Sequence, residues 1–192
     1  AEEFDALNAP DFAKRGAVSD EYLEIFAKLW TGEPVSHNGA SYQFNEVSCQ
    51  PTPVQRPGPP IWIGGHSRPA LRRAAKYGHG WHPVGANAAA PLPPDEMAVL
   101  ISELKQLTVA EGRDFDAMTL SFKAPLYDTA TTMEDGNRRP FSGTNDQLIE
   151  DIHTYANLGI EELIFDFRSP TLTESLDRME KCAAEIMTPA GL

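Results

Sequence analysis

A glycine turn after a short apolar run contains the residues best suited to bind an anion. Residues 61–63 follow two prolines and are apolar, which is typical of a buried strand. Gly64, Gly65 and His66 come next, and Ser67 is expected to be the N-cap of the following helix. Backbone N–H groups and the positive end of a helix dipole attract phosphate. The sequence therefore suggests a phosphate site here, although the same glycines could form only a tight turn.

His82 and Pro83 are the second candidate pair, because they end the next expected strand, which starts near Trp81. Active sites of barrels of parallel strands lie at the carboxyl ends of the strands. We therefore expect His82 and Pro83 to lie at the same rim as the glycine turn. The alternative for His82 is a structural histidine near the surface.

Other ionisable residues are given structural roles. Asp166 lies inside the expected strand 163–167, where a carboxylate requires a partner, and a structural partner is preferred to a catalytic role. His37 is expected at the surface of a hairpin. Trp62 and Trp81 are expected to be core aromatic residues.

No motif in the sequence identifies a catalytic residue or a metal site. Cys49 and Cys182 are far apart, and neither belongs to a CxxC pair, so we expect two inert thiols. The sequence has no HExxH motif and no recognisable Ser-His-Asp arrangement. We therefore predict no metal and leave the catalytic residues unassigned.

The composition is that of an ordinary globular protein with an acidic surface. The 192 residues are 41% hydrophobic and 23% charged, which suits one domain with a sizeable core. The net charge of −12 argues against nucleic acid and against anionic membrane surfaces as partners. We see no apolar run long enough to span a membrane and no secretory signal, so we expect a cytoplasmic location.

The first third of the sequence predicts helices followed by a hairpin. Gly16 is expected to break an opening helical segment, and a new helix is expected from Ser19 to about Gly32. Its expected buried face consists of Tyr22, Ile25, Phe26 and Leu29. Asn38-Gly39 predicts a hairpin with a type I′ turn. We expect the hairpin and the proline-rich segment that follows, about 33–60, to be an insertion within one domain, 1–192, rather than a linker between two domains.

From residue 61 the pattern alternates regularly between strand and helix. Thr144 with Gln147 and Thr171 with Glu174 are capping boxes that begin the last two helices. The expected strands are 61–64, 81–85, 118–126 and 163–167, and the expected helices are 68–77, 95–111, 144–158 and one from Thr171. We expect Leu176, Met179, Ala183 and Ile186 to be the inward face of the last helix.

This alternation predicts an α/β fold with four parallel strands and right-handed crossovers. Such a sheet could be a small doubly wound sheet or half of an eight-stranded barrel. The opening helices have no strand before them. We therefore favour a TIM (β/α)8 barrel, of which this chain supplies roughly the C-terminal half, with a hairpin insertion.

The same motifs resemble those of the bacterial luciferase-like monooxygenase family. The resemblance is carried in order by residues 2–4, Leu29-Trp30-Thr31, residues 50–55, the Pro60 to Gly65 strand and turn, the 70–75 helix, Gly80-Trp81 and Ser142-Gly143-Thr144. It extends over essentially the whole chain, and the F420-dependent oxidoreductases are the branch it is most similar to.

The resemblance implies a TIM barrel with a flavin or deazaflavin at the C-terminal ends of the strands. It implies that Gly64, Gly65, His66 and Ser67 hold the cofactor phosphate and that His82 and Pro83 line the cofactor or substrate. Coenzyme F420 is the expected cofactor, with FMN as the alternative. The full-length protein is expected to be a homodimer that acts on a small-molecule substrate.

The implied activity is hydride transfer between F420 and a small organic substrate. The alternatives are an FMN-dependent monooxygenase, a non-catalytic flavin-binding relative, and a fragment that is inactive alone. Two departures from the family are visible: His79 replaces the usual Asp before Gly80-Trp81, and residues 85–94 contain no Lys or Arg. The second argues against a phosphorylated sugar as substrate.

Overall fold

The computed structural model describes residues 2–85, 91–127 and 130–192. The chain divides into two compact units, Ala1–Ile61 and Trp62–Leu192, and each is described by itself. The loop expected at residues 86–94 falls largely outside the described residues.

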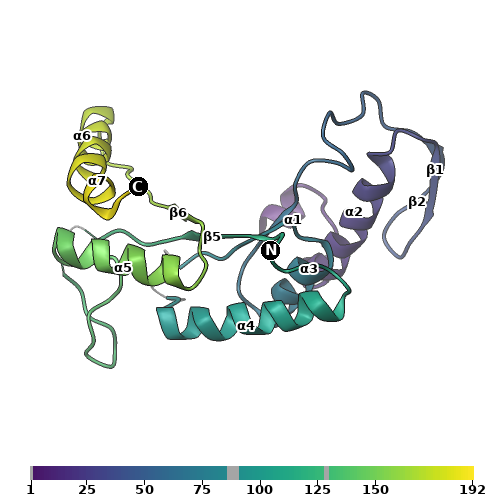
Figure 1. Cartoon of the computed structure of the whole chain (residues 1–192). Coiled ribbons are helices and arrows are strands. Elements are labelled where there is room, and N and C mark those ends of the chain that lie inside the picture. Colours follow the sequence, from purple (N-terminus) through teal and green to yellow (C-terminus); the bar gives the residue numbers. More distant parts are fainter. Residues whose placement is uncertain (1, 86–90, 128–129) are drawn as a thin grey trace. The chain divides into compact units, whose positions relative to one another are not determined.

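The first unit begins with helices that differ from the expectation (Figure 1). These are α1 (Glu2–Ala6), the 3-10 turn η1 (Phe12–Lys14) and α2 (Arg15–Leu29). Gly16 lies inside α2, so the expected break there was wrong: the carbonyl of Phe12 is already bonded by Arg15, which continues the turn into the helix. Only Ile25 of the expected buried face is buried, because this small unit leaves Tyr22 and Phe26 exposed.

The hairpin consists of β1 (Val35–Asn38) and β2 (Gln43–Val47), paired antiparallel. Asn38 pairs with Gln43 inside the ladder, and its φ is not positive, so the expected type I′ turn was wrong. Residues 39–42 form a longer turn instead, closed by a bond from the Gly39 N–H to the Tyr42 carbonyl.

Glu21 of α2 explains the longer turn, because its carboxylate holds the hairpin. It accepts hydrogen bonds from the backbone N–H groups of Ser41 and Tyr42, each at 2.9 Å, and lies 3.0 Å from His37 Nε2. Burial raises the pKa of Glu21, but these hydrogen bonds outweigh it and the net pKa is lowered. The His37 side chain is only 7% exposed, so its expected surface position was wrong.

The second unit is built on a four-stranded sheet in the order β3-β4-β5-β6. All neighbouring pairs in it are parallel, as predicted, and the strands follow one another along the sheet. The strands are β3 (Trp62–Gly64), β4 (Gly80–His82), β5 (Thr119–Lys123) and β6 (Glu162–Ile164). The helices are α3 (Arg68–Tyr77), α4 (Pro94–Ala110), α5 (Asn145–Asn157) and α6 (Leu172–Cys182), followed by a π-helical segment (Ala183–Met187) and α7 (Thr188–Ala190).

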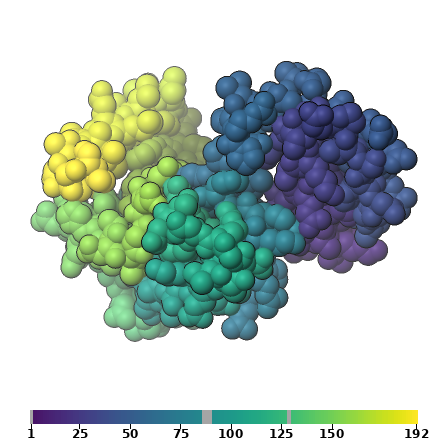
Figure 2. Space-filling model, turned by 45° about the vertical axis from the view of Figure 1, so that its right-hand side comes forward, coloured from purple at the N-terminus to yellow at the C-terminus, as the bar shows by residue number. Residues whose placement is uncertain are grey.

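One face of this sheet is packed against helices. Ile63, Trp81, Leu120 and Phe122 lie on this face and are buried. Helix α4 packs against α3 (Figure 1), and the teal atoms of this part of the chain lie together in the space-filling view (Figure 2). The predicted inward residues of α3 and α5 are confirmed: Leu71, Ala74 and Ala75 are buried in α3, and Leu148, Ile152 and Tyr155 in α5.

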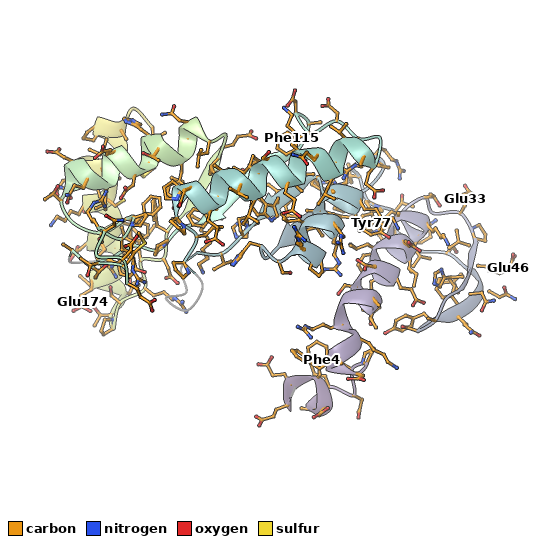
Figure 3. The ribbon with its side chains drawn as sticks, turned by 90° about the horizontal axis from the view of Figure 1, so that it is seen from below. Phe4, Glu33, Glu46, Tyr77, Phe115 and Glu174 are labelled. Carbon is orange, nitrogen blue, oxygen red and sulfur yellow. The ribbon has the colours of Figure 1, made fainter. Side chains whose placement is uncertain are left out.

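The loop between α4 and β5 contacts both α3 and α4. The loop after α4 folds back, so that Phe115 lies beside α4, with its ring 5.5 Å from Lys105 Nζ (Figure 3). Arg113 of the same loop donates to the carbonyls of Ala75 and Gly78 and so satisfies the end of α3, near the labelled Tyr77. The chain therefore returns to β5 with α3 and α4 held together.

Arg138, which precedes α5, forms a bidentate ion pair with Asp151 of α5. Arg138 Nη1 and Nη2 lie 2.8 and 2.7 Å from the Asp151 carboxylate, which also accepts the Phe141 backbone N–H at 2.6 Å. Phe141 is fully buried with φ of 60°, a left-handed conformation that is costly for this residue type. The ion pair holds that conformation and places Phe141 against Tyr155, with ring centroids 5.1 Å apart.

Both predicted capping boxes are present, at Thr144 with Gln147 and at Thr171 with Glu174. The expected inward face of α6 was largely wrong. Ile186 is buried, but Leu176 and Met179 are 51% and 50% exposed. Periodicity located the helix and its apolar stripe, but the stripe has no cover among the described residues.

Candidate functional site

The site is built at the carboxyl edge of the sheet, starting with the turn between β3 and α3. Gly64 ends β3 and pairs with His82, which ends β4. Gly65 has φ of +84°, which a residue with a side chain rarely adopts. Gly64, Gly65 and Ser67 are exposed, so the turn presents backbone rather than side chains.

The turn is held from the helix-packed face. Trp81 is completely buried, and its indole Nε1 donates to the Gly65 carbonyl at 2.8 Å. That bond points the Gly65 carbonyl inward. The first backbone N–H groups of α3 have no acceptor within the helix, so they remain available at the turn.

Ser67 is the N-cap residue of α3, as predicted, but its side chain makes no capping hydrogen bond. Its hydroxyl therefore remains a donor that the helix does not use. Next to it, His66 Nδ1 is buried and has no partner among the described residues. An orphaned ring nitrogen, an uncommitted hydroxyl and the N-terminus of a ten-residue helix fit a phosphate group.

His82 lies on the open face of the sheet, opposite the helices. Its Nδ1 is 2.9 Å from the hydroxyl of Ser121, which is completely buried. Burial lowers the pKa of His82, the positive charge of Lys123 lowers it further, and Glu162 opposes both. The lowered pKa of His82 favours the neutral imidazole.

Pro83 lies beside His82 but faces the other way. Its ring is fully buried, and its carbonyl accepts the backbone N–H of Lys123 at 3.1 Å. Of the six residues predicted to contact the cofactor, the structure brings Gly64, Gly65, His66, Ser67 and His82 to one edge. Pro83 is buried on the helix-packed face of the sheet, so its ring does not reach this edge.

A charged group follows at the ends of β5 and β6. Lys123 Nζ lies 3.9 Å from the Asp166 carboxylate. Arg168 donates hydrogen bonds to the same carboxylate from Nε and Nη2, at 2.9 and 2.6 Å. The Arg168 hydrogen bonds lower the pKa of Asp166 to about 2. Asp166 lies beyond the observed end of β6, and its role as a paired carboxylate is confirmed.

Sequence reasoning missed three residues of the open face. Ser121 and Lys123 occur in the same strand, two positions apart, and that alternation was the available signal. Trp62 was expected in the core but is 39% exposed, because it lies on the open face. Its indole covers Gly80, where an added Cβ would come within 2.8 Å of the ring.

Among the described residues, no group of three or more His, Cys, Asp or Glu side chains could hold a metal ion. Within the same part of the chain, no helix has the length and apolarity required to cross a bilayer.

The fold and this edge define an α/β protein with a partial barrel of parallel strands and a glycine turn at its carboxyl rim. The model of the luciferase-like monooxygenase family matches residues 1–134. The chain belongs to that family.

Relatives by sequence include an uncharacterized protein of Mycobacterium bovis, 34% identical over 136 residues. The match covers 70% of this chain and 44% of that protein. A second relative is the FMNH2-dependent dimethylsulfone monooxygenase of Pseudomonas putida, 33% identical over 88 residues, which are 45% of this chain and 24% of that protein.

Solved structures share the fold. A monooxygenase from Streptomyces bottropensis has a TM-score of 0.72 at 21% identity, covering 97% of this chain and 65% of that chain. The coenzyme F420-dependent tetrahydromethanopterin reductase from Methanopyrus kandleri has a TM-score of 0.66 at 12% identity, covering 90% and 62%. This chain thus spans under two thirds of each of these proteins.

Proposed function

We propose that this chain carries the phosphate end of a flavin or deazaflavin site in an oxidoreductase of the luciferase-like family. The observation that carries the proposal is the Gly64 to Ser67 turn. It combines a left-handed glycine, an uncommitted hydroxyl and an orphaned His66 Nδ1 at the start of α3. A cofactor phosphate would accept hydrogen bonds from the Ser67 hydroxyl and from the unpaired backbone N–H groups at the start of α3.

The rest of the cofactor would extend from this turn over the open face of the sheet. That face is where His82 and Trp62 lie, with ring centroids 6.3 Å apart. The bound cofactor would supply the redox chemistry, and the protein would position it and the substrate and keep water away.

The reaction we propose is hydride transfer between coenzyme F420 and a small organic substrate. The F420-dependent enzymes among the structural relatives support the cofactor class. We propose a homodimer for the complete protein, as the family resemblance implies.

FMN-dependent monooxygenation is the second candidate. The relative from Pseudomonas putida is described as FMNH2-dependent and is 33% identical over its matched segment. The glycine turn is compatible with both cofactors, because both carry a phosphate on a ribityl chain.

The test is a fluorescence titration of the complete protein with F420 and, separately, with FMN. We expect one of them to bind at about micromolar concentration, a binding free energy of roughly −8 kcal/mol. Binding of neither would overturn the proposal. Binding without turnover under any reductant would instead indicate a non-catalytic flavin-binding relative.

A further inference from the structure

The open face of the sheet carries a set of polar side chains that the phosphate turn does not use. In strand register, Gly64, His82, Ser121 and Glu162 form one row, and Lys123 stands in the next row toward the carboxyl edge. The rows of a closed barrel are usually filled with branched apolar side chains. A histidine, a buried serine and a lysine in these rows therefore call for a functional explanation.

Among the described residues, the ring of His82 is hydrogen-bonded through one nitrogen. Its Nδ1 is fixed at 2.9 Å by the Ser121 hydroxyl, which is itself completely buried. Its Nε2 bonds to no described residue. One nitrogen is thus anchored in the sheet, and the other is left for a group that lies over the open face.

The surroundings of His82 favour the neutral ring. Lys123 faces it from β5 and Glu162 from β6, while the neighbours on β3, Trp62 and Gly64, carry no charge. Lys123 keeps its place through Asp166, 3.9 Å away, and Asp166 is in turn held by Arg168. The arrangement places a positive charge near the imidazole and disfavours a second one.

We propose that His82 is a catalytic residue that exchanges a proton with the substrate through Nε2, with Ser121 as its positioning residue. The inference rests on the proposed function. Its place in the fold supports it, because Gly64, which ends the strand before the phosphate turn, is the register partner of His82.

In the direction of substrate oxidation, one hydride and one proton would leave the substrate. A bound oxidised deazaflavin would supply the hydride acceptor, so the substrate C–H hydrogen would leave with its electron pair to that cofactor. The O–H or N–H bond of the hydroxyl or amine attached to the same carbon would break. Its electron pair would form the new C=O or C=N bond, and its proton would go to His82 Nε2. In the reverse direction the imidazolium returns that proton. Neutral imidazole suits the first role, since a base must be unprotonated to accept.

The test uses the complete protein and compares His82→Gln, Ser121→Ala and the wild type. For His82→Gln we expect kcat to fall about 10²-fold or more, the usual contribution of a positioned acid or base. The dissociation constant of the cofactor should change by less than about tenfold. A purely structural role would instead weaken cofactor binding and stability together, which thermal unfolding would reveal.

The pH profile provides a readout that does not depend on the size of the loss. In the wild type, activity should fall as the pH drops through the lowered pKa of His82. Lys123→Met removes the positive charge, so the acid limb, and the imidazole titration followed by NMR, should move to higher pH. An unmoved His82 titration, or full turnover by His82→Gln, would overturn the inference. Absence of cofactor binding by the wild type would overturn the proposed function instead.

Discussion

Asp151 holds several groups that would otherwise be buried without partners. Its carboxylate is paired with Arg138 and accepts the N–H of the strained Phe141. We predict that Asp151→Ala lowers the free energy of unfolding by about 3 kcal/mol, because one partner of a buried pair is left behind. Urea unfolding measures this. Glu150→Gln, on the exposed side of the same helix, is the control and should change stability by less than about 0.5 kcal/mol. Equal effects would contradict the role of the pair.

Asp166 gives a prediction about pH. Its pKa of about 2 lies below the ordinary value, so its pairing with Arg168 favours the ionised form. The stabilisation is present above the unfolded pKa of about 4 and is lost as the pH falls toward the folded value. Arg168→Met should therefore raise the Asp166 titration seen by carboxyl NMR toward about 4. An unchanged titration would show that Arg168 does not set it.

Between the neighbouring strands β3 and β4, the Trp62 side chain packs over Gly80 on the open face of the sheet. A Cβ at residue 80 would meet the indole of Trp62 at 2.8 Å. We predict that Gly80→Ala costs about 1–3 kcal/mol of stability, as overpacking usually does. In a Trp62→Ala background the same change should cost much less, which a double-mutant cycle measures. Additive effects would mean that the ring does not impose the glycine.

The elements themselves were largely predictable, and the reasons are local. The capping boxes at Thr144 and Thr171 and the 3.6-residue periodicity of α3 and α5 are encoded in adjacent residues. The error in the hairpin turn occurred because a distant partner decides its length. Glu21 lengthened the hairpin turn by bonding Ser41 and Tyr42, and no pattern within the hairpin reveals that carboxylate.

The candidate site was predictable in part. The two adjacent glycines after an apolar run predict the turn. The regular alternation of strands and helices predicts where β4 ends. The orientation of each residue at the rim depends on sheet register, which is why Pro83 faced the core while His82 faced outward. The Ser121 contact with His82 joins residues 39 positions apart and required the fold.

At the scale of the molecule, two features predict association of the 192-residue chain with itself. The sheet has edges at β3 and β6, and α6 exposes Leu176 and Met179. Exposed edges and apolar stripes are sites of further pairing. We expect sedimentation to show dimers or larger species, and Leu176→Gln with Met179→Gln to shift them toward monomer. A monomeric chain that unfolds cooperatively would contradict this prediction.

We propose that the Gly64 to Ser67 turn holds the phosphate of a flavin or deazaflavin. The most direct test of this proposal is the cofactor dissociation constant of the complete protein with Gly65→Ala, compared with Gly112→Ala. Gly65 and Gly112 have positive φ, at +84° and +70°, so both substitutions add backbone strain. Gly112 follows the end of α4, and a Cβ added there would have no atom within 4 Å. We predict that Gly65→Ala weakens binding by about tenfold or more while Gly112→Ala leaves it unchanged. Equal affinities for the two variants would contradict the account.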